Sequence, residues 1–244
     1  MDTTQRLDKF LSNSGYASRR SIKQFLRENT VTINGVKARE SGIRIDLSKD
    51  DIRINNQKIK KEGFVYYLLN KPKGVVSTSA DEFDRKNVVD LIDTDVRVYP
   101  VGRLDKDTHG LILLTNDGEL THKLTHPKFH VPKTYLLKIE GSVSEGKLNK
   151  LRDGIILSDG LTNPAKVKVR KETPNTTELE MEIYEGRYRQ IRRMCEAIHL
   201  NLIDLQRIKF GPIKIDKLRL EHYRELTKAE VESLKKATEK DTII

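Results

Sequence analysis

Stretches with strand and helix periodicity follow one another irregularly along this chain, and that order limits the fold more than any other feature. Apolar and polar residues alternate at 167–169 and at 179–183, as in half-buried strands. The spacing of a buried helix face is met by Ile191, Met194, Cys195 and Ile198. Because strands and helices do not alternate regularly, we expect an α+β fold with a mainly antiparallel mixed sheet flanked by helices, and not a doubly wound parallel sheet.

Two parts of the chain are distinguishable by pattern. Residues 1–60 predict a small unit of two helices packed on a short sheet, with a hairpin turn at Asn34-Gly35. Residues 61–64 have the composition of a linker. A larger domain is expected over 65–236, followed by a flexible polar tail at 237–244.

Several residues mark helix ends. Gly15 is placed where a left-handed residue would end the first helix, Ser18 is a candidate N-cap for the second, and Asn29 can end it. Thr227 and Glu230 have the spacing of a capping box that opens a last helix.

The charge of the chain is strongly positive and unevenly distributed. The net charge is +10 over 244 residues, and residues 1–62 contain 14 Lys and Arg against 8 Asp and Glu. Four-residue spacing places Arg19, Lys23 and Arg27 on one helix face, with Arg20 beside them. Such a face is suited to phosphates, although most charge runs are only solvated surface. The surplus favours a polyanionic partner, most often nucleic acid.

Other classes of protein are excluded by what the sequence lacks. A single cysteine, Cys195, rules out a disulfide framework and a multi-cysteine zinc site, and its place on a buried helix face favours a core residue over a nucleophile. No run approaches the roughly 18 apolar residues of a membrane helix. The polar first ten residues contain no apolar signal core, so we expect a cytoplasmic protein that does not bind membranes.

A charged loop between two glycines, residues 102–110, leads into the apolar strand expected at 111–114. Polar side chains at the end of a rigid element are a common site architecture. Asp105 lies between Arg103 and Lys106, and neighbouring positive charge favours an ionised carboxylate that can act as nucleophile or base.

A second candidate segment, 185–194, contains four arginines at the start of the buried helix. Cations at a helix N-terminus oppose the helix dipole, so phosphates or a carboxylate should offset them. An arginine-rich solvated helix start is the alternative.

These segments resemble the RsuA/RluB-type ribosomal RNA pseudouridine synthases. The resemblance is carried by Arg103-Leu104-Asp105 within GRLDKDTHGLILLTNDGEL and by EGRYRQIRRM at 185–194. LLNKPKG at 68–74, KTY at 133–135 and GPI at 211–213 match the same family in the same order. Residues 1–60, from RLDKFL through SRR to VTING, resemble the RNA-binding domain named after ribosomal protein S-four. This chain departs from that domain at 28–30, where Glu-Asn-Thr replaces the usual glycine.

The resemblance implies an isomerase that cleaves the bond between ribose and uracil nitrogen, turns the base and rejoins it through carbon 5. This chemistry needs no cofactor and no metal. Asp105 would be the ionised carboxylate at the reacting nucleotide, and Arg192 would pair with it. Tyr135 would stack on the uracil, and its hydroxyl could help to move the proton from carbon 5.

Ribosomal RNA is the implied partner, and the form RQIRRM favours the large-subunit RNA. Because the target uridine lies in folded RNA, it would be swung out to reach the site. Arg103, Lys106 and Arg189 are expected to hold the opened strand, and Arg19, Arg20 and Lys23 to bind RNA from the small unit. We expect a monomer, and leave open whether the substrate is naked RNA or a ribosome-assembly intermediate.

Three other interpretations compete with this one. Asp105 and Asp107 could form a glycosidase pair, but the neighbouring cations would lower both pKa values, and we expect Asp107 to be structural. The histidines at 122, 126 and 130 invite a metal site, but Pro127 prevents them from sharing one helix face. A non-catalytic RNA-binding or ribosome-assembly protein remains the alternative function, although it would not need Asp105, Tyr135 and Arg192 together.

Overall fold

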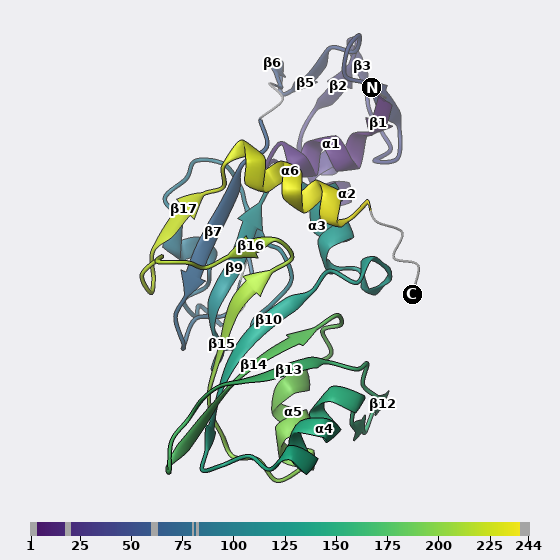
Figure 1. Cartoon of the computed structure of the whole chain (residues 1–244). Coiled ribbons are helices and arrows are strands. Elements are labelled where there is room, and N and C mark those ends of the chain that lie inside the picture. Colours follow the sequence, from purple (N-terminus) through teal and green to yellow (C-terminus); the bar gives the residue numbers. More distant parts are fainter. Residues whose placement is uncertain (1–3, 18–20, 60–62, 80, 82, 240–244) are drawn as a thin grey trace. The chain divides into compact units, whose positions relative to one another are not determined.

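The computed structural model describes residues 4–17, 21–59, 63–79, 81 and 83–239, which form two compact units (Figure 1). The first comprises Met1–Val65, Thr94–Val98 and Asn116–Gly118, and the second comprises Tyr66–Asp93, Tyr99–Thr115 and Glu119–Ile244. In the described ranges, every helix is too short or too polar to cross a membrane.

The N-terminal unit has two short helices and short strands, as its sequence predicts. The helices are α1 (Leu7–Asn13) and α2 (Ile22–Glu28). The strands are β1 (Thr4–Arg6), β2 (Val31–Ile33), β3 (Val36–Lys37), β4 (Arg44–Asp46), β5 (Ile52–Ile54) and β6 (Gln57–Lys58). One sheet has the order β3-β2-β5-β6, and β1 pairs with β4. The apolar side chains of both helices are buried against these strands, which supplies the hydrophobic stabilisation of the unit.

The turns of this unit follow the predicted residues. Gly15 has φ of +80° and follows Ser14, the C-cap of α1. Asn34 and Gly35 have φ of +51° and +81°, as a two-residue hairpin turn requires. Asn29 ends α2 as expected. The proposed cap Ser18 lies outside the described residues.

The junction after α2 does without the glycine that the S-four type usually has. Asn29 has an extended backbone with φ of −124°, so no left-handed residue is needed there. Its side-chain oxygen accepts a hydrogen bond from Asn55 Nδ2 at 2.9 Å, and Thr30 N donates to Asn55 Oδ1 at 2.9 Å. Side-chain amides therefore hold this turn in place of a glycine.

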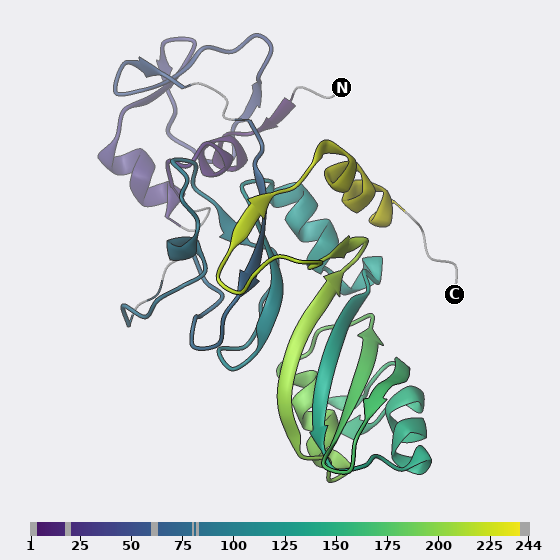
Figure 2. The same cartoon turned by 60° about the vertical axis from the view of Figure 1, so that its left-hand side comes forward.

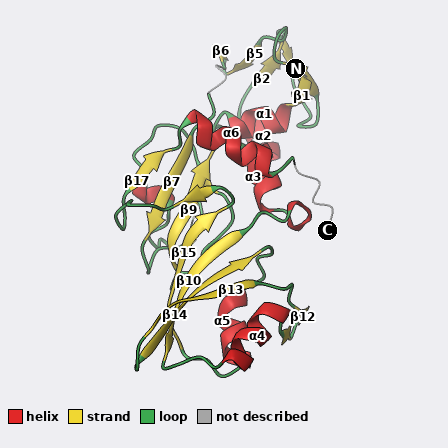
Figure 3. Ribbon diagram, viewed as in Figure 1, coloured by secondary structure: helices red, strands yellow, loops and turns green. Residues whose placement is uncertain are grey.

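The rest of the described chain is a large mixed sheet with helices. Its strands are β7 (Tyr66–Lys71), β8 (Tyr99–Pro100), β9 (His109–Thr115), β10 (Lys133–Glu140), β11 (Ile156–Leu157), β12 (Gly160–Leu161), β13 (Lys166–Glu172), β14 (Thr176–Ile183), β15 (Leu202–Phe210), β16 (Ile213–Lys214) and β17 (Tyr223–Glu225). Its helices are η1 (Val89–Leu91), α3 (Gly118–Thr125), η2 (Pro127–Phe129), α4 (Glu145–Asp153), α5 (Gln190–Ala197) and α6 (Lys228–Ala237). Figure 3 shows how the strands and helices are distributed.

The main sheet has the strand order β13-β14-β10-β15-β9-β7-β17. Its neighbouring strands along this order run antiparallel except β15 and β9, whose parallel pairing joins Gln206 to His109 and Arg207 to Gly110. The predicted α+β class with a mainly antiparallel mixed sheet is therefore confirmed. The parallel junction brings the end of the 102–110 loop next to β15, which helps to build the site described below.

One half of this sheet is covered on one face by two helices. Figures 1 and 2 show α4 and α5 together beside β10, β13 and β14. The four residues of the predicted helix stripe are all buried in this core: Ile191, Met194, Cys195 and Ile198. They pack with Leu148 and Leu151 of α4 against strand side chains such as Leu137 and Met181, and each such burial contributes about 1.5–3 kcal/mol.

The last helix, α6, begins as predicted. Thr227 accepts a hydrogen bond from the backbone of Glu230, and the Glu230 side chain accepts one from the backbone of Thr227, which completes the capping box. Leu234 of this helix is buried with Leu120 and Leu124 of α3 in a second core.

Candidate active site

The loop between β8 and β9 is held rigidly, and it carries Asp105. Ser77 Oγ donates to Leu104 O at 2.8 Å and accepts from Leu104 N at 3.1 Å, while Thr108 N donates to Asp105 O at 3.1 Å. Leu104 and Thr108 are buried, so the loop is anchored on both sides of the carboxylate. The Asp105 side chain itself is 30% exposed. A partly exposed carboxylate on a fixed backbone is available to a substrate without being loose.

Asp105 lies at a crevice of about 410 Å³ that Tyr135 and Arg192 also border. Its walls come from the 102–108 loop, from β10, β14 and β15, and from the segment that opens α5. The structure therefore brings together the three residues that the family resemblance assigns to the catalytic group.

The prediction that Arg192 forms an ion pair with Asp105 is wrong. Arg192 Nη2 donates to the backbone oxygen of Asp107 at 3.0 Å and to Thr108 Oγ1 at 3.1 Å, and Arg192 Nε lies 3.3 Å from Asp107 Oδ2. The cation beside Asp105 is Arg189, whose Nη1 lies 3.9 Å from Asp105 Oδ2. Arg192 lies on the first turn of a helix and reaches the neighbouring carboxylate, whereas Arg189 precedes that helix.

Asp107 is the residue that joins the two arginines. It accepts two hydrogen bonds of 3.0 Å from Arg189 in a bidentate pair, besides its contact with Arg192. Burial alone would raise the pKa of Asp107, but the hydrogen bonds from Arg189 and the charge of Arg192 outweigh this and hold the pKa below its ordinary value. A lowered pKa is contrary to the general acid of a glycosidase and agrees with the structural role expected for Asp107.

Arg189 adopts an unusual backbone conformation. Its φ of +46° lies in the left-handed region, which costs a non-glycine residue about 1–2 kcal/mol. The pair with Asp107 and the helix that begins at Gln190 offset that cost. The geometry directs the guanidinium of Arg189 towards both Asp107 and Asp105.

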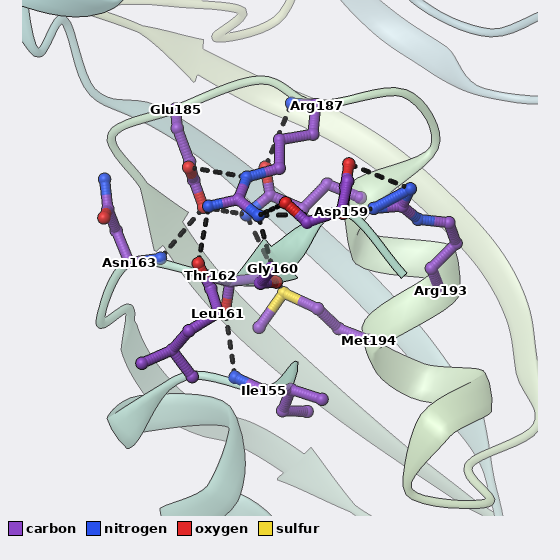
Figure 4. Close-up of polar contacts among 11 residues, drawn as sticks. Ile155, Asp159, Gly160, Leu161, Thr162, Asn163, Glu185, Arg187, Arg193 and Met194 are labelled. Carbon is purple, nitrogen blue, oxygen red and sulfur yellow. Dashed lines mark hydrogen bonds and ion pairs between the residues drawn. The ribbon is translucent and has the colours of Figure 1, made fainter. Parts of the chain in front are cut away.

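The segment around Arg187 is fastened to the hairpin of β11 and β12, as Figure 4 shows. Arg187 donates from Nη2 to Leu161 O at 2.6 Å and from Nε to the Glu185 carboxylate at 3.0 Å. Arg193 forms a bidentate pair with Asp159, at 3.1 and 2.6 Å. Carboxylates and carbonyls thus offset the charge of these two arginines at the helix start, so they act as supports of the crevice wall.

Tyr135 faces a buried arginine that sequence reasoning missed. It pairs across the sheet with Arg207 of β15, which is 3% exposed and donates from Nε to Leu111 O at 2.7 Å. Arg207 Nη2 is buried without a hydrogen-bond partner. Burial lowers the pKa of Arg207, and Tyr135 acts in the opposite direction. A buried cation, Arg207, is therefore held beside Tyr135, and Tyr135 itself lines the crevice.

A second buried cation, Lys71, lies behind the Asp105 loop. Its side chain is completely buried, and its ammonium donates to Pro72 O and Thr108 O, both at 2.9 Å. Burial lowers its pKa to about 8, although Asp105 and Asp107 attract its charge. Lys71 belongs to the 68–74 motif, but nothing in that motif marks it as buried.

The expected RNA-binding residues differ in how far the structure describes them. Arg103 and Lys106 are exposed on the loop beside Asp105. Lys23 is exposed on α2 of the N-terminal unit. Arg19 and Arg20 lie outside the described residues. Arg189 is 35% exposed, so it can reach a ligand as well as its carboxylate partners.

The other candidate groups take structural positions. Cys195 is buried, and burial raises its pKa to about 12, which leaves the thiol unreactive. His126 caps η2 by accepting from Lys128 N, and its ring lies 5.1 Å from that of His122. Across the described residues, three or more His, Cys, Asp or Glu are nowhere arranged to hold a metal ion.

Comparison with known proteins decides the family. The family described as RNA pseudouridylate synthase matches residues 65–197, and the S4 domain matches residues 5–52. The chain belongs to the RNA pseudouridine synthases. Its overall pattern is that of the RsuA/RluB type expected from the sequence motifs, with an S4 domain ahead of the synthase domain.

Relatives of this pseudouridine synthase match along nearly its whole length. Ribosomal large subunit pseudouridine synthase B of Bacillus subtilis (strain 168) is 42% identical, over 95% of this chain and 96% of the relative. Dual-specificity RNA pseudouridine synthase RluF of Salmonella typhi is 34% identical, over 98% of this chain and 81% of the relative. A crystal structure described as pseudouridylate synthase has 33% identity and a TM-score of 0.68, covering 94% of this chain and 99% of that one. The chain is therefore an enzyme, an isomerase that acts on RNA.

Proposed function

We propose that this synthase converts one specific uridine of ribosomal RNA, most consistently the large-subunit RNA, to pseudouridine. The substrate class is supported by the relative at 42% identity, whose name specifies the large ribosomal subunit. The positive charge of the chain, +10, agrees with a polyanionic substrate. A cytoplasmic location belongs to the same proposal, because ribosomal RNA is found there in bacteria such as those of the relatives.

The observation that carries the proposal is the position of Asp105 at the crevice that Tyr135 borders. We assign to Asp105 the ionised carboxylate that acts on the nucleotide, through the sugar, the base or a ribose proton. The guanidinium of Arg189 lies beside this carboxylate, with Nη1 3.9 Å from Asp105 Oδ2. A crevice of about 410 Å³ is large enough for a uridine swung out of its helix.

Tyr135 and Arg192 have different parts in this proposal. Tyr135 offers a ring for the uracil to stack on and a hydroxyl for the carbon 5 proton, with Arg207 beside it. Arg192 acts through Asp107, because its contacts are to the carbonyl and carboxylate of that residue. It therefore positions the loop that carries Asp105, and we no longer assign to it a direct role at the reacting atoms.

The strand around the target uridine would be held by Arg103, Lys106 and Arg189, which border the site. The S4 domain would add a second set of phosphate contacts from Lys23 and from Arg19 and Arg20. A monomer suffices for this arrangement. Whether the RNA is naked or part of an assembling particle is decided by comparing the two as substrates.

The test is release of tritium from ribosomal RNA that carries uridine labelled at carbon 5. The wild-type enzyme is expected to release label in proportion to pseudouridine formed, and Asp105→Asn is expected to release none while its RNA affinity stays within a few-fold. Asp153→Asn, which neutralises an exposed carboxylate at the end of α4, is the matched control and should behave as the wild type. Mapping pseudouridine in ribosomal RNA with and without the gene identifies the position.

Two results would contradict the proposal. Full activity of Asp105→Asn would remove the carboxylate from the mechanism. Tight binding of ribosomal RNA without any release of label by the wild type would favour the alternative, an RNA-binding assembly protein on a synthase fold.

A further inference from the structure

Two aromatic side chains stand in solvent beside the site and have no part in the mechanism above. Phe83 and Tyr188 are each 75% exposed, more than any other aromatic residue in the described part of the chain. A ring that is left in water contributes little to folding, because its apolar surface is not buried. Their exposure therefore needs an explanation other than the stability of the fold.

Both rings border one groove, which contains Asp105. The groove has a volume of about 580 Å³ and runs from residues 76–78, 81, 83 and 85 to Tyr188 and Arg189. It joins the crevice, because both are lined by residues 103–105 and 188–189. An RNA strand that places one nucleotide at Asp105 would therefore have its neighbouring nucleotides along this groove.

The Phe83 ring is held in place by a charged neighbour. Arg85 lies with its guanidinium carbon 5.0 Å from the ring centroid, which is a cation–π contact. Asp81 fixes this arrangement, since it accepts from Arg85 Nη2 at 2.7 Å and from the backbone N of Phe83 at 3.1 Å. The contacts of Asp81 and Arg85 therefore hold Phe83 while its ring remains exposed.

Tyr188 is fixed by the residues on either side of it. Arg187 is hydrogen-bonded to the β11–β12 hairpin, as Figure 4 shows, and Arg189 is paired with Asp107. Because both neighbours are anchored, the backbone of Tyr188 has little freedom, while its ring remains exposed. A rigid support lowers the entropy that a ligand must remove on binding.

The charge of the groove indicates the kind of chain that it accepts. Its lining includes four cations, Arg85, Arg103, Lys106 and Arg189, against two carboxylates, Asp81 and Asp105. Asp81 and Arg85 are paired with each other, which leaves three cations against one carboxylate. Exposed rings among cations are the combination that binds single-stranded nucleic acid, by stacking on bases and by contact with phosphates.

We propose that Phe83 and Tyr188 are stacking platforms for two bases of single-stranded RNA that flank the nucleotide presented to Asp105. This inference rests on the proposed function and adds to it the residues that hold the opened strand. Stacking on a ring tolerates any base, so the platforms contribute affinity and position, while the choice of uridine is left to the crevice.

The test compares variants that keep the ring with variants that keep only apolar bulk. Phe83→Tyr and Tyr188→Phe retain a ring, whereas Phe83→Leu and Tyr188→Leu remove it. Ile156→Ala, which shortens an 80% exposed side chain outside the groove, is the matched control. The probes are a fluorescent twelve-residue oligouridylate and the same strand without bases, with affinities measured by anisotropy.

Each leucine variant is expected to bind the oligouridylate about five- to tenfold more weakly than the wild type. The ring-preserving variants and Ile156→Ala should stay within about twofold, and the strand without bases should bind all variants equally. With ribosomal RNA, the leucine variants should raise KM by a similar factor and leave kcat within about twofold. Two results would contradict the proposal that these rings stack on bases. The leucine variants would bind the oligouridylate as tightly as the wild type does, or they would lose as much affinity for the strand without bases as for the oligouridylate.

Binding to these strands needs no turnover, so the two proposals fail separately. Ring-dependent affinity in an enzyme that releases no tritium from ribosomal RNA would contradict the proposed function and leave a stacking surface. Tritium release with ring-independent affinity and KM would contradict the platforms alone.

Discussion

Arg192 Nη2 donates a hydrogen bond of 3.0 Å to the backbone oxygen of Asp107, two residues beyond the carboxylate it was expected to neutralise. The arginine of the 185–194 motif therefore holds the backbone of the Asp105 loop. Arg189 is left to face Asp105, and Asp107 joins both arginines. The loop and the start of α5 are consequently one electrostatic unit.

This arrangement predicts which residues depend on one another. In a double-mutant cycle, Arg192→Leu and Asp107→Asn should show a coupling of about 1 kcal/mol in the free energy of unfolding, reduced by the partial exposure of Asp107. Arg192→Leu and Asp105→Asn should add independently to within about 0.5 kcal/mol. Urea denaturation of the single and double variants measures both values. A larger coupling with Asp105 than with Asp107 would restore the original pairing.

The buried Lys71 predicts a dependence of stability on pH. Its pKa is lowered by burial from 10.5 to about 8. Below pH 8 the folded chain carries the full cost of the buried charge. Between pH 8 and 10.5 the unfolded chain still binds the proton and the folded chain has lost it, so stability rises with pH.

Between pH 8 and 10.5, the free energy of unfolding of the wild type should therefore rise relative to that of Lys71→Met, by up to about 1.4 kcal/mol per pH unit. Urea denaturation at pH 7.5 and pH 9.5 measures the difference between the two proteins. Lys168→Met, which removes an exposed lysine of β13, is the control and should show a constant difference. The same constant difference for Lys71→Met would show that Lys71 does not titrate in this range.

Sequence reasoning found the parts of the site that lie in loops and at helix starts. The charged loop between two glycines marks Asp105 only weakly, and its role came from the resemblance of this loop to the family motif, whereas the α5 stripe was identifiable because its spacing is periodic. The partner of Arg192 could not be predicted from the sequence. Residues 105 and 107 are both carboxylates, and only the backbone path decides which one the guanidinium reaches.

Lys71 and Arg207 were missed for a different reason. Lys71 follows an apolar run and precedes Pro72, so its surroundings predict a turn, although it is the last residue of β7. Arg207 lies in a strand, where a cation looks like the solvent-facing member of an alternating pattern. Their burial depends on contacts distant in sequence, from Lys71 to Thr108 and from Arg207 to Leu111. A local pattern contains no information on such contacts.

The buried Cys195 predicts an unreactive thiol. Its side chain lies in the core with Met194, and burial raises its pKa to about 12, so the thiolate that reacts with disulfide reagents is scarce at neutral pH. The native protein should react with an aromatic disulfide reagent at least about a hundredfold more slowly than the protein in guanidinium. Absorbance of the released thiol measures both rates. Comparable rates would mean that α5 opens readily or that Cys195 is accessible.

The parallel junction of β9 and β15 depends on the absence of a side chain at Gly110. Gly110 has φ of +106°, and a Cβ built on it would lie 2.3 Å from the backbone oxygen of Arg207 and 2.8 Å from its nitrogen. Because backbone atoms of a paired strand cannot move aside cheaply, an alanine would force β9 away from β15. The displacement would also reach the Asp105 loop, which ends where β9 begins.

Gly110→Ala is therefore expected to lower the free energy of unfolding by about 3 kcal/mol or more and to reduce activity. Gly141→Ala is the matched control, since Gly141 also has a positive φ, +71°, but no atom lies within 4 Å of its built Cβ. It should cost only the backbone strain, about 1 kcal/mol, and leave activity unchanged. Urea denaturation and tritium release measure the two effects. Equal losses of stability in the two variants would mean that backbone strain alone, and not the approach to Arg207, requires glycine at position 110.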